Sequence, residues 1–432
     1  MKKVYTVFSA DHIHGGHIKI IKAAAALGRL TVGVLTDKVV AEYKRYPLLS
    51  YEERANVLSS IKGVHNVVPQ EQLSYLANLT ALKPDIVVHG DDWRTGYQSK
   101  IRAEVVNYLD ENGGRLVELP YSKNEEYKQL ELTMRKQSGF SDLRRKKLLR
   151  MLELKNCIRV IEAHNGISGL LAEETKIYED GKTKQFDAIW VSSLCDSTAK
   201  GRPDIELVDM TSRIRTIEDI MQVTTKPIIL DCDTGGLIEH FVYNIETLER
   251  IGVSAAIIED KTGLKRNSLF GTDVPQEQAG AEHFAEKIRL GKKALLTDEF
   301  MLIARIESLI LEKGMDDALK RADIYTDAGA DGIMIHSRKK EPDEILEFCQ
   351  KFREKHEHIP LVVVPSSFVD ITEEELESYG VNIVIYANHL IRSAFPAMKK
   401  AAELILRHHR AKEADEICMP ISEILTIIPE KH

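Results

Sequence analysis

Two acidic clusters follow apolar runs in the second half of the chain. The run PIILDCD ends in Asp231, Cys232 and Asp233, and AAIIED ends in Glu259 and Asp260. Because side chains alternate along a strand, Asp231 and Asp233 point to one face and Cys232 to the other. Together with Glu259 they form a hard oxygen site that suits Mg²⁺, and like charges at one rim favour a cation. We predict these three as metal ligands; the alternative is ordinary surface carboxylates.

Two cationic or titratable side chains lie in neighbouring apolar segments. Arg305 stands inside LIARIES. A buried guanidinium there needs an anion, either Glu307 or a bound phosphate or carboxylate. His336 ends IMIHS and is either a functional donor or a core histidine bonded to backbone.

The segment EDKTGLKRNSLFG, residues 259–271, follows a strand directly and contains glycine and basic and polar residues. Its Lys265 and Asn267 are two positions apart and can point the same way. The composition indicates a lid that closes over an anionic substrate, with a solvated surface loop as the alternative.

A histidine pair follows the first apolar run of the chain. His14 and His17 are separated by two glycines, so both can face one ligand at the start of a helix. Gly16 allows close approach of the backbone, and a helix amino terminus favours an anion. The pattern indicates a nucleotide phosphate site, or two histidines that merely cap a surface helix.

Eight short apolar segments position the acidic and cationic residues of the second part. Helix-length amphipathic stretches separate them, which implies parallel strands covered on both faces, and eight such units close a (β/α)8 TIM-type barrel. The segments are 158–163, 187–193, 227–233, 255–260, 301–307, 332–337, 361–367 and 382–388. Reactive groups of such barrels sit at the carboxyl ends of the strands. The polar residues at these ends are Glu162, Ser192, Asp231, Asp233, Glu259, Arg305, His336, Ser337 and Asn388.

The first part of the chain alternates strands and helices and predicts a small Rossmann-like α/β sheet with room for a nucleotide. The expected strands are 4–10, 31–37, 85–92 and 115–120, around a helix at 18–28. A charged, helix-prone stretch at 124–154 connects this part to the barrel. The predicted domains are 1–135, a helical linker at 136–155, and the barrel at 156–432.

Size and composition agree with this plan. At 432 residues the chain exceeds one ordinary core, and its net charge of −8 gives no reason to expect nucleic acid. The basic runs 144–147 and 338–340 are expected to be solvated surface. Five isolated cysteines indicate a reducing compartment. An early Asp11 argues against a signal peptide, and no stretch is long and apolar enough to suggest a membrane, so we expect a cytoplasmic protein.

The amino-terminal motifs resemble a known family. In order they are HGGH (14–17), TVGVLTD (31–37), Lys44-Arg45, PLLSYEERANVL (47–58), VVPQ (67–70) and VVHGDDW (87–93). Together they resemble the cytidylyltransferases that activate glycerol phosphate, phosphocholine or phosphoethanolamine with CTP. The resemblance implies a nucleotide-binding set. Its members are Asp11 beside the acceptor, His14, Gly16 and His17 on the triphosphate, Lys44 on phosphate, and Arg54 on acceptor or phosphate.

One motif departs from that family. Its members carry a second signature close to RTxGIST, where this chain has YSKNEEYKQ (121–129). Ser122 and Lys123 remain, but Glu125 and Glu126 stand where an anion should bind, and like charges repel. Two alternatives stay open: an active transferase that uses CTP with Mg²⁺, or a domain that only binds nucleotide or mediates assembly.

The barrel motifs resemble phosphoenolpyruvate mutase of the isocitrate lyase superfamily, over about residues 156–430. They are EAHNGISG (162–169), WVSSL (190–194), Asp204, LDCDTG (230–235), EDKTGLKRNS (259–268), ARIES (304–308), IHSRK (335–339) and YANHLIR (386–392). Carbon–carbon lyases of that superfamily use a lid cysteine, which this lid lacks. Phosphonopyruvate hydrolases lack the lid asparagine, which Asn267 supplies here. The missing lid cysteine and the presence of Asn267 both favour a mutase, with a phosphonopyruvate hydrolase or a carbon–carbon lyase as alternatives.

The resemblance implies interconversion of phosphoenolpyruvate and 3-phosphonopyruvate. Mg²⁺ would sit near Asp231, with Asp233 and Glu259 acting through water. The implied catalytic residues are Ser192, Asp204, Lys265, Asn267, Arg305 and His336. The implied substrate-binding residues are Trp190, Ser193, Leu194 and Ser337.

A cytidylyltransferase joined to such a mutase resembles the bifunctional enzymes of phosphonate biosynthesis. The resemblance implies CMP transfer from CTP to a phosphonate such as 2-hydroxyethyl- or 2-aminoethylphosphonate. It also implies a homo-oligomer, a dimer or tetramer, in which subunits exchange the last barrel helix. The long amphipathic stretch at 390–410 suits that exchange.

Overall fold

The computed structural model describes residues 1–43, 47–95, 98–120, 139–179 and 182–428. The chain divides into two compact units. The first consists of Met1–Phe140, Leu149–Asn156 and Thr175–Gln185, and the second contains the remainder. Because residues 121–138 lie outside the described ranges, the predicted boundary at 135 stays a prediction.

The first unit is built on a parallel sheet with strand order β3-β2-β1-β4-β5. Its strands are β1 (Lys3–Phe8), β2 (Arg29–Leu35), β3 (Val64–Gln70), β4 (Ile86–Gly90) and β5 (Arg115–Leu119). Central β1 is buried from Val4 onward because its apolar run is continuous. Four strands lie where the sequence predicts them. The additional strand β3 is polar and contains Pro69, which an edge position tolerates.

Helices and short turns complete this unit and confirm the predicted Rossmann-like class. They are α1 (Gly15–Leu27), α2 (Asp37–Tyr43), α3 (Tyr51–Ser59), α4 (Leu76–Leu82), η1 (Asp91–Arg94) and α5 (Gln98–Glu111). The strand order runs one way from β1 through β2 and the other way through β4. In open parallel sheets a ligand binds at the carboxyl ends of the strands at such a point, which is where the HGGH turn opens α1.

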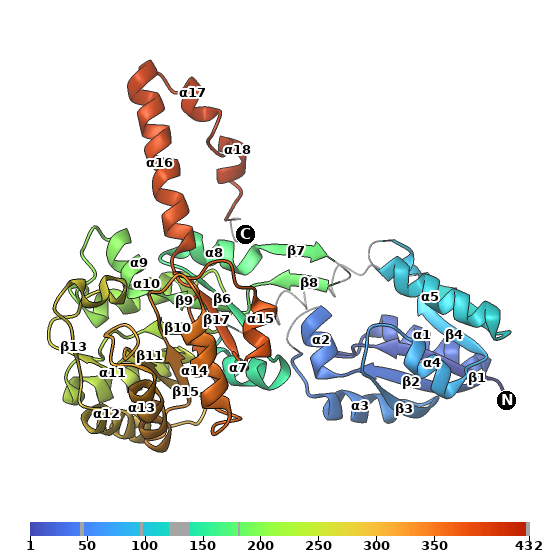
Figure 1. Ribbon diagram of the computed structural model, residues 1–432. Helices are drawn as coiled ribbons and strands as arrows, with labels where there is room; N and C mark the ends of the chain where they lie inside the picture. The colour runs from blue at the N-terminus through green and yellow to red at the C-terminus, as the bar shows by residue number, and fades with distance from the viewer. Residues whose placement is uncertain (44–46, 96–97, 121–138, 180–181, 429–432) are drawn as a thin grey trace. The chain divides into compact units, whose positions relative to one another are not determined.

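The second unit is a closed barrel of eight parallel strands, as predicted (Figure 1). Its strands, in order around the barrel, are β6 (Ile158–Glu162), β9 (Ala188–Val191), β10 (Ile228–Asp231), β11 (Ala255–Glu259), β14 (Met301–Ile306), β15 (Gly332–Ile335), β16 (Leu361–Val363) and β17 (Ile383–Tyr386). Each corresponds to one apolar segment of the sequence. Every strand is buried over nearly its whole length, because helices cover the outside and side chains fill the inside.

The barrel helices bury apolar stripes against these strands, with aromatic side chains such as Phe241, Phe284 and Phe348 between the layers. The helices from residue 141 onward are α7 (Ser141–Leu154), α8 (Gly166–Glu174), α9 (Ser193–Ala199), α10 (Met210–Met221), α11 (Ile238–Ile251), α12 (Ala281–Ala294), α13 (Met315–Asp327), α14 (Asp343–Arg353), α15 (Glu373–Ser378) and α16 (His389–His408), of which α16 does not bury an apolar stripe. Further short elements are β7 (Lys176–Glu179), β8 (Lys182–Gln185), β12 (Lys261–Thr262), η2 (Ser268–Asp273), β13 (Glu277–Gln278), α17 (Lys412–Asp415) and α18 (Ile421–Ile424).

The basic run in α7 is a correction to the sequence-based expectation. Arg144 and Arg145 are only 3% and 6% exposed rather than solvated. Arg144 Nη2 donates to the carbonyl oxygen of Thr224 at 2.7 Å, and Arg145 Nη1 donates to that of Glu249 at 2.9 Å. The two guanidinium groups therefore satisfy one carbonyl group in the segment before β10 and one in the last turn of α11.

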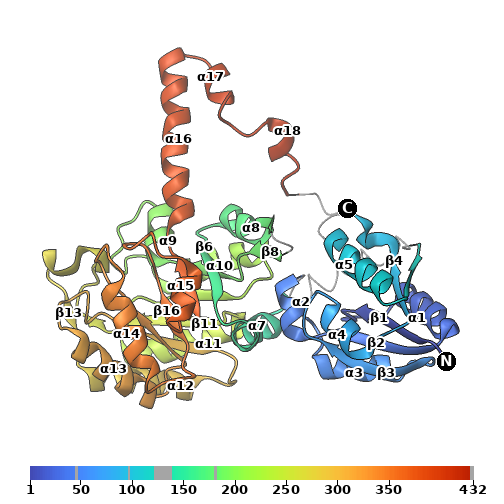
Figure 2. The same ribbon diagram turned by 45° about the vertical axis from the view of Figure 1, so that its right-hand side comes forward.

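The last long helix leaves the barrel without burying any side chain. In Figures 1 and 2, α16 projects away from the strands. Its apolar residues Phe395, Met398 and Leu406 are 66%, 63% and 75% exposed. Among the described residues, no helix is both long and apolar enough to cross a membrane.

Candidate functional site

The carboxyl ends of three neighbouring strands bring acidic and basic side chains together at the barrel mouth. Asp231 ends β10, Glu259 ends β11, and Arg305 lies directly beside Glu259 in the register of β11 and β14. Asp233 follows in the turn after β10 with a left-handed φ of 51°. All four are less than 10% exposed, so the charges must compensate one another or a ligand.

Asp231 is held by the start of α9. The backbone amide of Ser193 donates to Asp231 Oδ2 at 3.1 Å, and the Ser193 hydroxyl donates to the same oxygen at 2.9 Å. Burial alone would raise the pKa of Asp231, but Lys265, Arg305 and Arg213 outweigh it and lower the pKa below its usual range. This carboxylate is therefore ionised and oriented.

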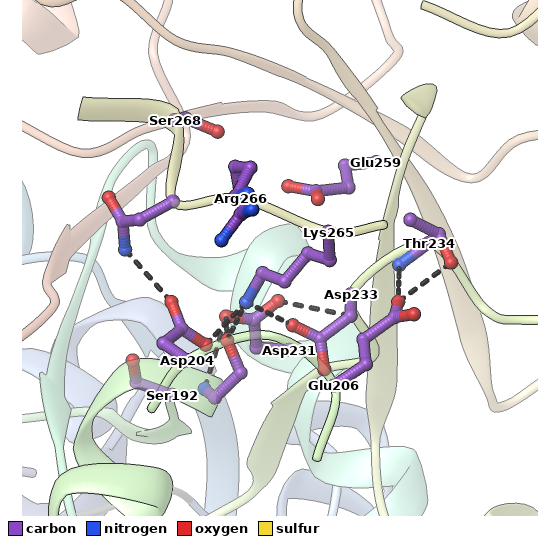
Figure 3. A network of polar contacts seen from close by, with 12 residues as sticks. Ser192, Asp204, Glu206, Asp231, Asp233, Thr234, Glu259, Lys265, Arg266 and Ser268 are labelled. Carbon is purple, nitrogen blue, oxygen red and sulfur yellow. Dashed lines mark hydrogen bonds and ion pairs between the residues drawn. The ribbon is translucent and has the colours of Figure 1, made fainter. Parts of the chain in front are cut away.

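The lid enters this cluster through Lys265, as Figure 3 shows. Its ammonium forms an ion pair with Asp233, bonds Asp204 Oδ1 at 2.5 Å, and donates to the Ser193 hydroxyl at 2.7 Å. Asn267 Nδ2 donates to the other oxygen of Asp204 at 2.9 Å. The two lid side chains thus point the same way, onto one carboxylate.

The second cation of the site is shared between two carboxylates. Arg305 Nε donates to Glu307 Oε1 at 2.6 Å, and its Nη2 lies 3.3 Å from Glu259 Oε2. Of the two anions expected for Arg305, the structure supplies Glu307. The Nη2 group of Arg305 also donates to the Ser268 hydroxyl.

His336 is close to Arg305, with 3.1 Å between Nδ1 and Nη2. Burial, and then the charge of Arg305, lower the pKa of His336 below its usual value, so it is neutral at pH 7. A guanidinium can only donate, so Nδ1 accepts and the proton of the neutral ring is on Nε2. His336 is therefore prepared to donate one hydrogen bond from Nε2.

The acidic side chains fit a Mg²⁺ ion that is held by one or two carboxylates together with water and substrate, rather than by protein ligands alone. Within the described residues, no three His, Cys, Asp or Glu side chains are grouped to hold a metal ion by themselves. Mg²⁺, however, commonly takes one or two carboxylates and completes its shell with water and substrate oxygens. Asp231 and Asp233 are hard oxygen donors at the mouth, and burial raises the pKa of Glu259 to about 7, which a nearby cation would reverse.

Other predicted residues contribute less directly. The Ser192 hydroxyl caps α9 by accepting from the amide of Cys195 at 3.4 Å. Ser337 bonds Glu344 and the amide of Lys339, outside the cluster. Trp190 is 2% exposed in β9. Leu194 is half-buried at the start of α9. Glu162 contacts His164 and accepts from the amide of Ile391. Asn388 accepts from Arg392.

Sequence reasoning missed three groups that shape the mouth. Arg213 of α10 donates to Asp233 at 3.0 Å, Lys261 bonds the lid from within, and the Ser268 hydroxyl donates to Glu307 at 2.5 Å. Arg213 sits on an amphipathic helix, where nothing in the spacing identifies its partner. Lys261 and Ser268 lie inside the lid motif, but the sequence does not indicate a chemical role for either, so they were not predicted as site residues.

The histidine pair of the first unit caps α1. His14 Nδ1 accepts from the amide of Gly16 at 3.1 Å, and His17 Nδ1 accepts from the amide of His14 at 3.4 Å. Because both Nδ1 atoms accept, a neutral ring carries its proton on Nε2. The capping interpretation and the ligand interpretation are therefore compatible, since capping orients two Nε2 donors at a helix amino terminus.

The other nucleotide-binding candidates that the structure describes, Asp11 and Arg54, are both buried. Asp11 Oδ1 accepts from the amides of Leu48 and Leu49 at 2.8 and 3.2 Å. Arg54 is fully buried and donates to Asp37 and to a carbonyl of Leu49, so it has no exposed surface for a phosphate in this structure. Lys44 and the segment 121–129, with its glutamates, lie outside the described residues.

Comparison with known proteins covers both units. The family model "Phosphoenolpyruvate phosphomutase" matches residues 148–406, and "Cytidylyltransferase-like" matches residues 6–130. A phosphoenolpyruvate phosphomutase of Tetrahymena pyriformis is 32% identical over 67% of this chain and 93% of its own length. A phosphonopyruvate hydrolase of Variovorax sp. is 36% identical over 61% of this chain and 88% of its own. A solved phosphonopyruvate hydrolase complex with oxalate and Mg²⁺ gives a TM-score of 0.58 at 32% identity, over 66% of this chain and 94% of that one.

Asp204 is predicted to hold the lid down. Replacing it (Asp204→Ala) removes the acceptor of both Lys265 and Asn267, and a lost hydrogen bond to a charged group costs about 1.5–3 kcal/mol. Amide hydrogen exchange over 261–278 should accelerate about tenfold or more. Asp209→Ala, an exposed cap of α10 in the same stretch of chain, is the control and should leave lid exchange unaltered. Equal exchange in Asp204→Ala and the unaltered protein would contradict the assignment.

Proposed function

The chain belongs to the phosphoenolpyruvate phosphomutase family, and from that membership we propose that its barrel interconverts phosphoenolpyruvate and 3-phosphonopyruvate. The observation that carries the proposal is the convergence of lid and barrel on one buried charged cluster. Lys265 and Asn267 from the lid meet Asp204, while Arg305 and His336 face the same mouth. A site with many fixed donors and no activated nucleophile suits the transfer of a phosphoryl group between two atoms of one substrate.

The donors have distinct proposed tasks. Arg305, neutral His336 and Asn267 bind the oxygens of the migrating phosphoryl group as it leaves the enol oxygen. The amides at the start of α9, near Ser193 and Leu194, hold the pyruvyl oxygens, with Trp190 lining the pocket. No proton has to move between phosphoenolpyruvate and 3-phosphonopyruvate, so no general base is required.

The carboxylates and the lid lysine set the electrostatics. Mg²⁺ bound near Asp231, with Asp233 and Glu259 acting through water, would supply positive charge to the pyruvyl oxygens as a Lewis acid. Ser193 fixes the orientation of Asp231 through two hydrogen bonds. Lys265 closes the mouth against Asp204 and Asp233, which excludes water that would otherwise take the phosphoryl group.

A phosphonopyruvate hydrolase is the second candidate, because one relative at 36% identity carries that name. It differs only in delivering the phosphoryl group to water. Asn267, which bonds Asp204 from the lid, favours the mutase. A carbon–carbon lyase needs an acid that protonates carbon, and residues 259–271 of the lid include no cysteine.

Asn267→Ala should lower isomerisation by about 100-fold or more, the usual loss when one transition-state donor is removed. The assay is phosphorus NMR of phosphoenolpyruvate with Mg²⁺ and a phosphonopyruvate decarboxylase, which draws the uphill reaction forward. The unaltered protein should give a phosphonate resonance, and Asn244→Ala on the outer helix α11 should behave like it. Inorganic phosphate as the sole product of the unaltered protein rejects the mutase, and full turnover by Asn267→Ala removes this residue from the mechanism.

For the first unit we propose CMP transfer from CTP, with Mg²⁺, to a phosphonate such as 2-hydroxyethyl- or 2-aminoethylphosphonate. The support is a cytidylyltransferase-like domain and two histidines that cap α1 through their Nδ1 atoms, so that each neutral ring carries its proton on Nε2. Both donors would stabilise the departing pyrophosphate. The alternative is a domain that binds nucleotide or mediates assembly without catalysis, which Glu125 and Glu126 motivate.

Pyrophosphate release from CTP distinguishes these alternatives. With 2-hydroxyethyl- or 2-aminoethylphosphonate the unaltered protein should release pyrophosphate, and His14→Ala should release it about 100-fold more slowly. His65→Ala in β3, an exposed histidine of the same unit, is the matched control and should retain the rate. If every phosphonate and phosphate ester fails as an acceptor, the non-catalytic alternative is favoured.

We also propose that the protein is a dimer or tetramer in which α16 packs on another subunit. The helix is amphipathic but buries no side chain of its own, and Phe395, Met398 and Leu406 form one exposed apolar stripe. Such a stripe is a characteristic interaction surface.

Leu406→Asp together with Phe395→Asp should lower the molar mass measured by sedimentation equilibrium to that of one chain. A charge buried in an apolar interface is strongly unfavourable, which gives the physical reason. The control is Lys400→Asp on the opposite face of the helix, which should keep the oligomer. If the unaltered protein is already monomeric, or if the oligomer survives the double substitution, α16 does not pack on another subunit as proposed.

A further inference from the structure

Lys261 lies at the base of the lid, yet no step of the proposed mechanism uses it. It is the first residue of β12 and pairs with Gln278 of β13, so it stands where both ends of the lid meet the barrel. It is only 4% exposed. A lysine is rarely buried this deeply unless its charge is compensated.

The ammonium of Lys261 is bonded to three separate points of the lid segment, which runs from the start of β12 to the end of β13, residues 261–278. Nζ donates to the carbonyl oxygen of Arg266 at 2.9 Å, to the Ser268 hydroxyl at 2.9 Å, and to Gln276 Oε1 at 3.0 Å. An ammonium has three protons, and these three acceptors match that number. The acceptors come from both arms of the lid, so one cation joins the outgoing arm to the returning arm.

The same cation is joined to the barrel. Nζ lies 3.2 Å from Glu259 Oε1 and 3.5 Å from Glu307 Oε2. Both carboxylates are nearly or fully buried and also hold Arg305. Ser268 extends the connection, because its hydroxyl donates to Glu307 and accepts from Arg305.

We infer that Lys261 is a positioning residue that shapes the closed lid, and that it determines whether the phosphoryl group goes to substrate or to water. Arg266 and Ser268 flank Asn267, so fixing these two neighbours fixes the backbone that aims the Asn267 amide at Asp204. The inference rests on the proposed mutase function. Lys261 itself contacts lid and barrel rather than the reacting atoms, and it acts through them.

The two fates of the phosphoryl group are chemically balanced. In both, the carbon–phosphorus bond of 3-phosphonopyruvate breaks and its electron pair stays on the pyruvate enolate. In isomerisation the enolate oxygen bonds to phosphorus and gives phosphoenolpyruvate. In hydrolysis a water oxygen bonds to phosphorus, and the proton it releases is taken up at C3 of the enolate, which gives pyruvate and hydrogen phosphate. A loosened lid admits the water for the second route.

The test uses the full chain with Mg²⁺ and 3-phosphonopyruvate, and measures the ratio of inorganic phosphate to phosphoenolpyruvate together with hydrogen exchange over 261–278. In Lys261→Met, both the ratio and the lid exchange should rise about tenfold, as expected for the loss of buried charge-assisted hydrogen bonds. Gln276→Leu removes one acceptor of Lys261, and with it the hydrogen bond from Gln276 Nε2 to the carbonyl oxygen of Gly271, but leaves Glu259 and Glu307 paired. It should shift both readouts in the same direction by less. It also keeps the test decisive if Lys261→Met does not fold.

Lys226→Met is the matched control. Lys226 is another buried lysine, 6% exposed, and lies just before β10, at the opposite end of that strand from Asp231. Its Nζ donates to the carbonyl oxygen of Phe186, which lies just before β9. It should lower stability without changing the product ratio or lid exchange. The inference is overturned if Lys261→Met and Gln276→Leu slow turnover while ratio and exchange stay as in the unaltered protein. If the unaltered protein yields only phosphate, the proposed mutase fails, and lid exchange alone still decides the role of Lys261.

Discussion

The salt bridge between the lid lysine and the buried carboxylates of the barrel mouth is the interaction on which the site depends. Lys265 joins Asp204 and Asp233, and the neighbouring Asp231 owes its lowered pKa largely to the same ammonium. Buried charges of this kind are stable only when their geometry is complete. The lid therefore has an electrostatic reason to close, and in closing it removes water from the place where the phosphoryl group would be transferred.

The regular construction of the barrel brings the charged residues of this site together. Parallel strands end at one rim, so residues from β10, β11 and β14 meet there although they are far apart in the chain. The start of α9 adds backbone donors at the same rim, and the two-stranded stem of β12 and β13 returns the lid to where it began. Rigid strands thus hold the carboxylates, while a loop carries Lys265 and Asn267.

Much of this architecture could be predicted from the sequence, because each barrel strand is a continuous apolar run that stops at a polar residue. That pattern located Asp231, Glu259 and Arg305 at a common rim, and the spacing of Lys265 and Asn267 indicated a shared direction. Apart from Glu307, which stands two residues from Arg305, the partners of the buried charges could not be predicted. Arg144 and Arg145 look like a solvated basic run, but they bond carbonyl groups that local spacing does not identify. Arg54 likewise resembles a phosphate ligand by motif, whereas tertiary packing encloses it beside Asp37. Strand β3 was missed because an edge strand needs no apolar run.

In the proposed mechanism the phosphoryl group passes between carbon and oxygen of the substrate without meeting solvent. The most direct measurement is conversion of 3-phosphonopyruvate in ¹⁸O-enriched water, followed by mass analysis of the phosphoenolpyruvate formed. A closed, dry mouth predicts phosphoenolpyruvate with no ¹⁸O in the three non-bridging oxygens of its phosphoryl group; the bridging oxygen is not counted, because the ketone of 3-phosphonopyruvate exchanges its oxygen with water. Incorporation of ¹⁸O into those non-bridging positions, or ¹⁸O-labelled phosphate as the sole phosphorus product, would contradict the account.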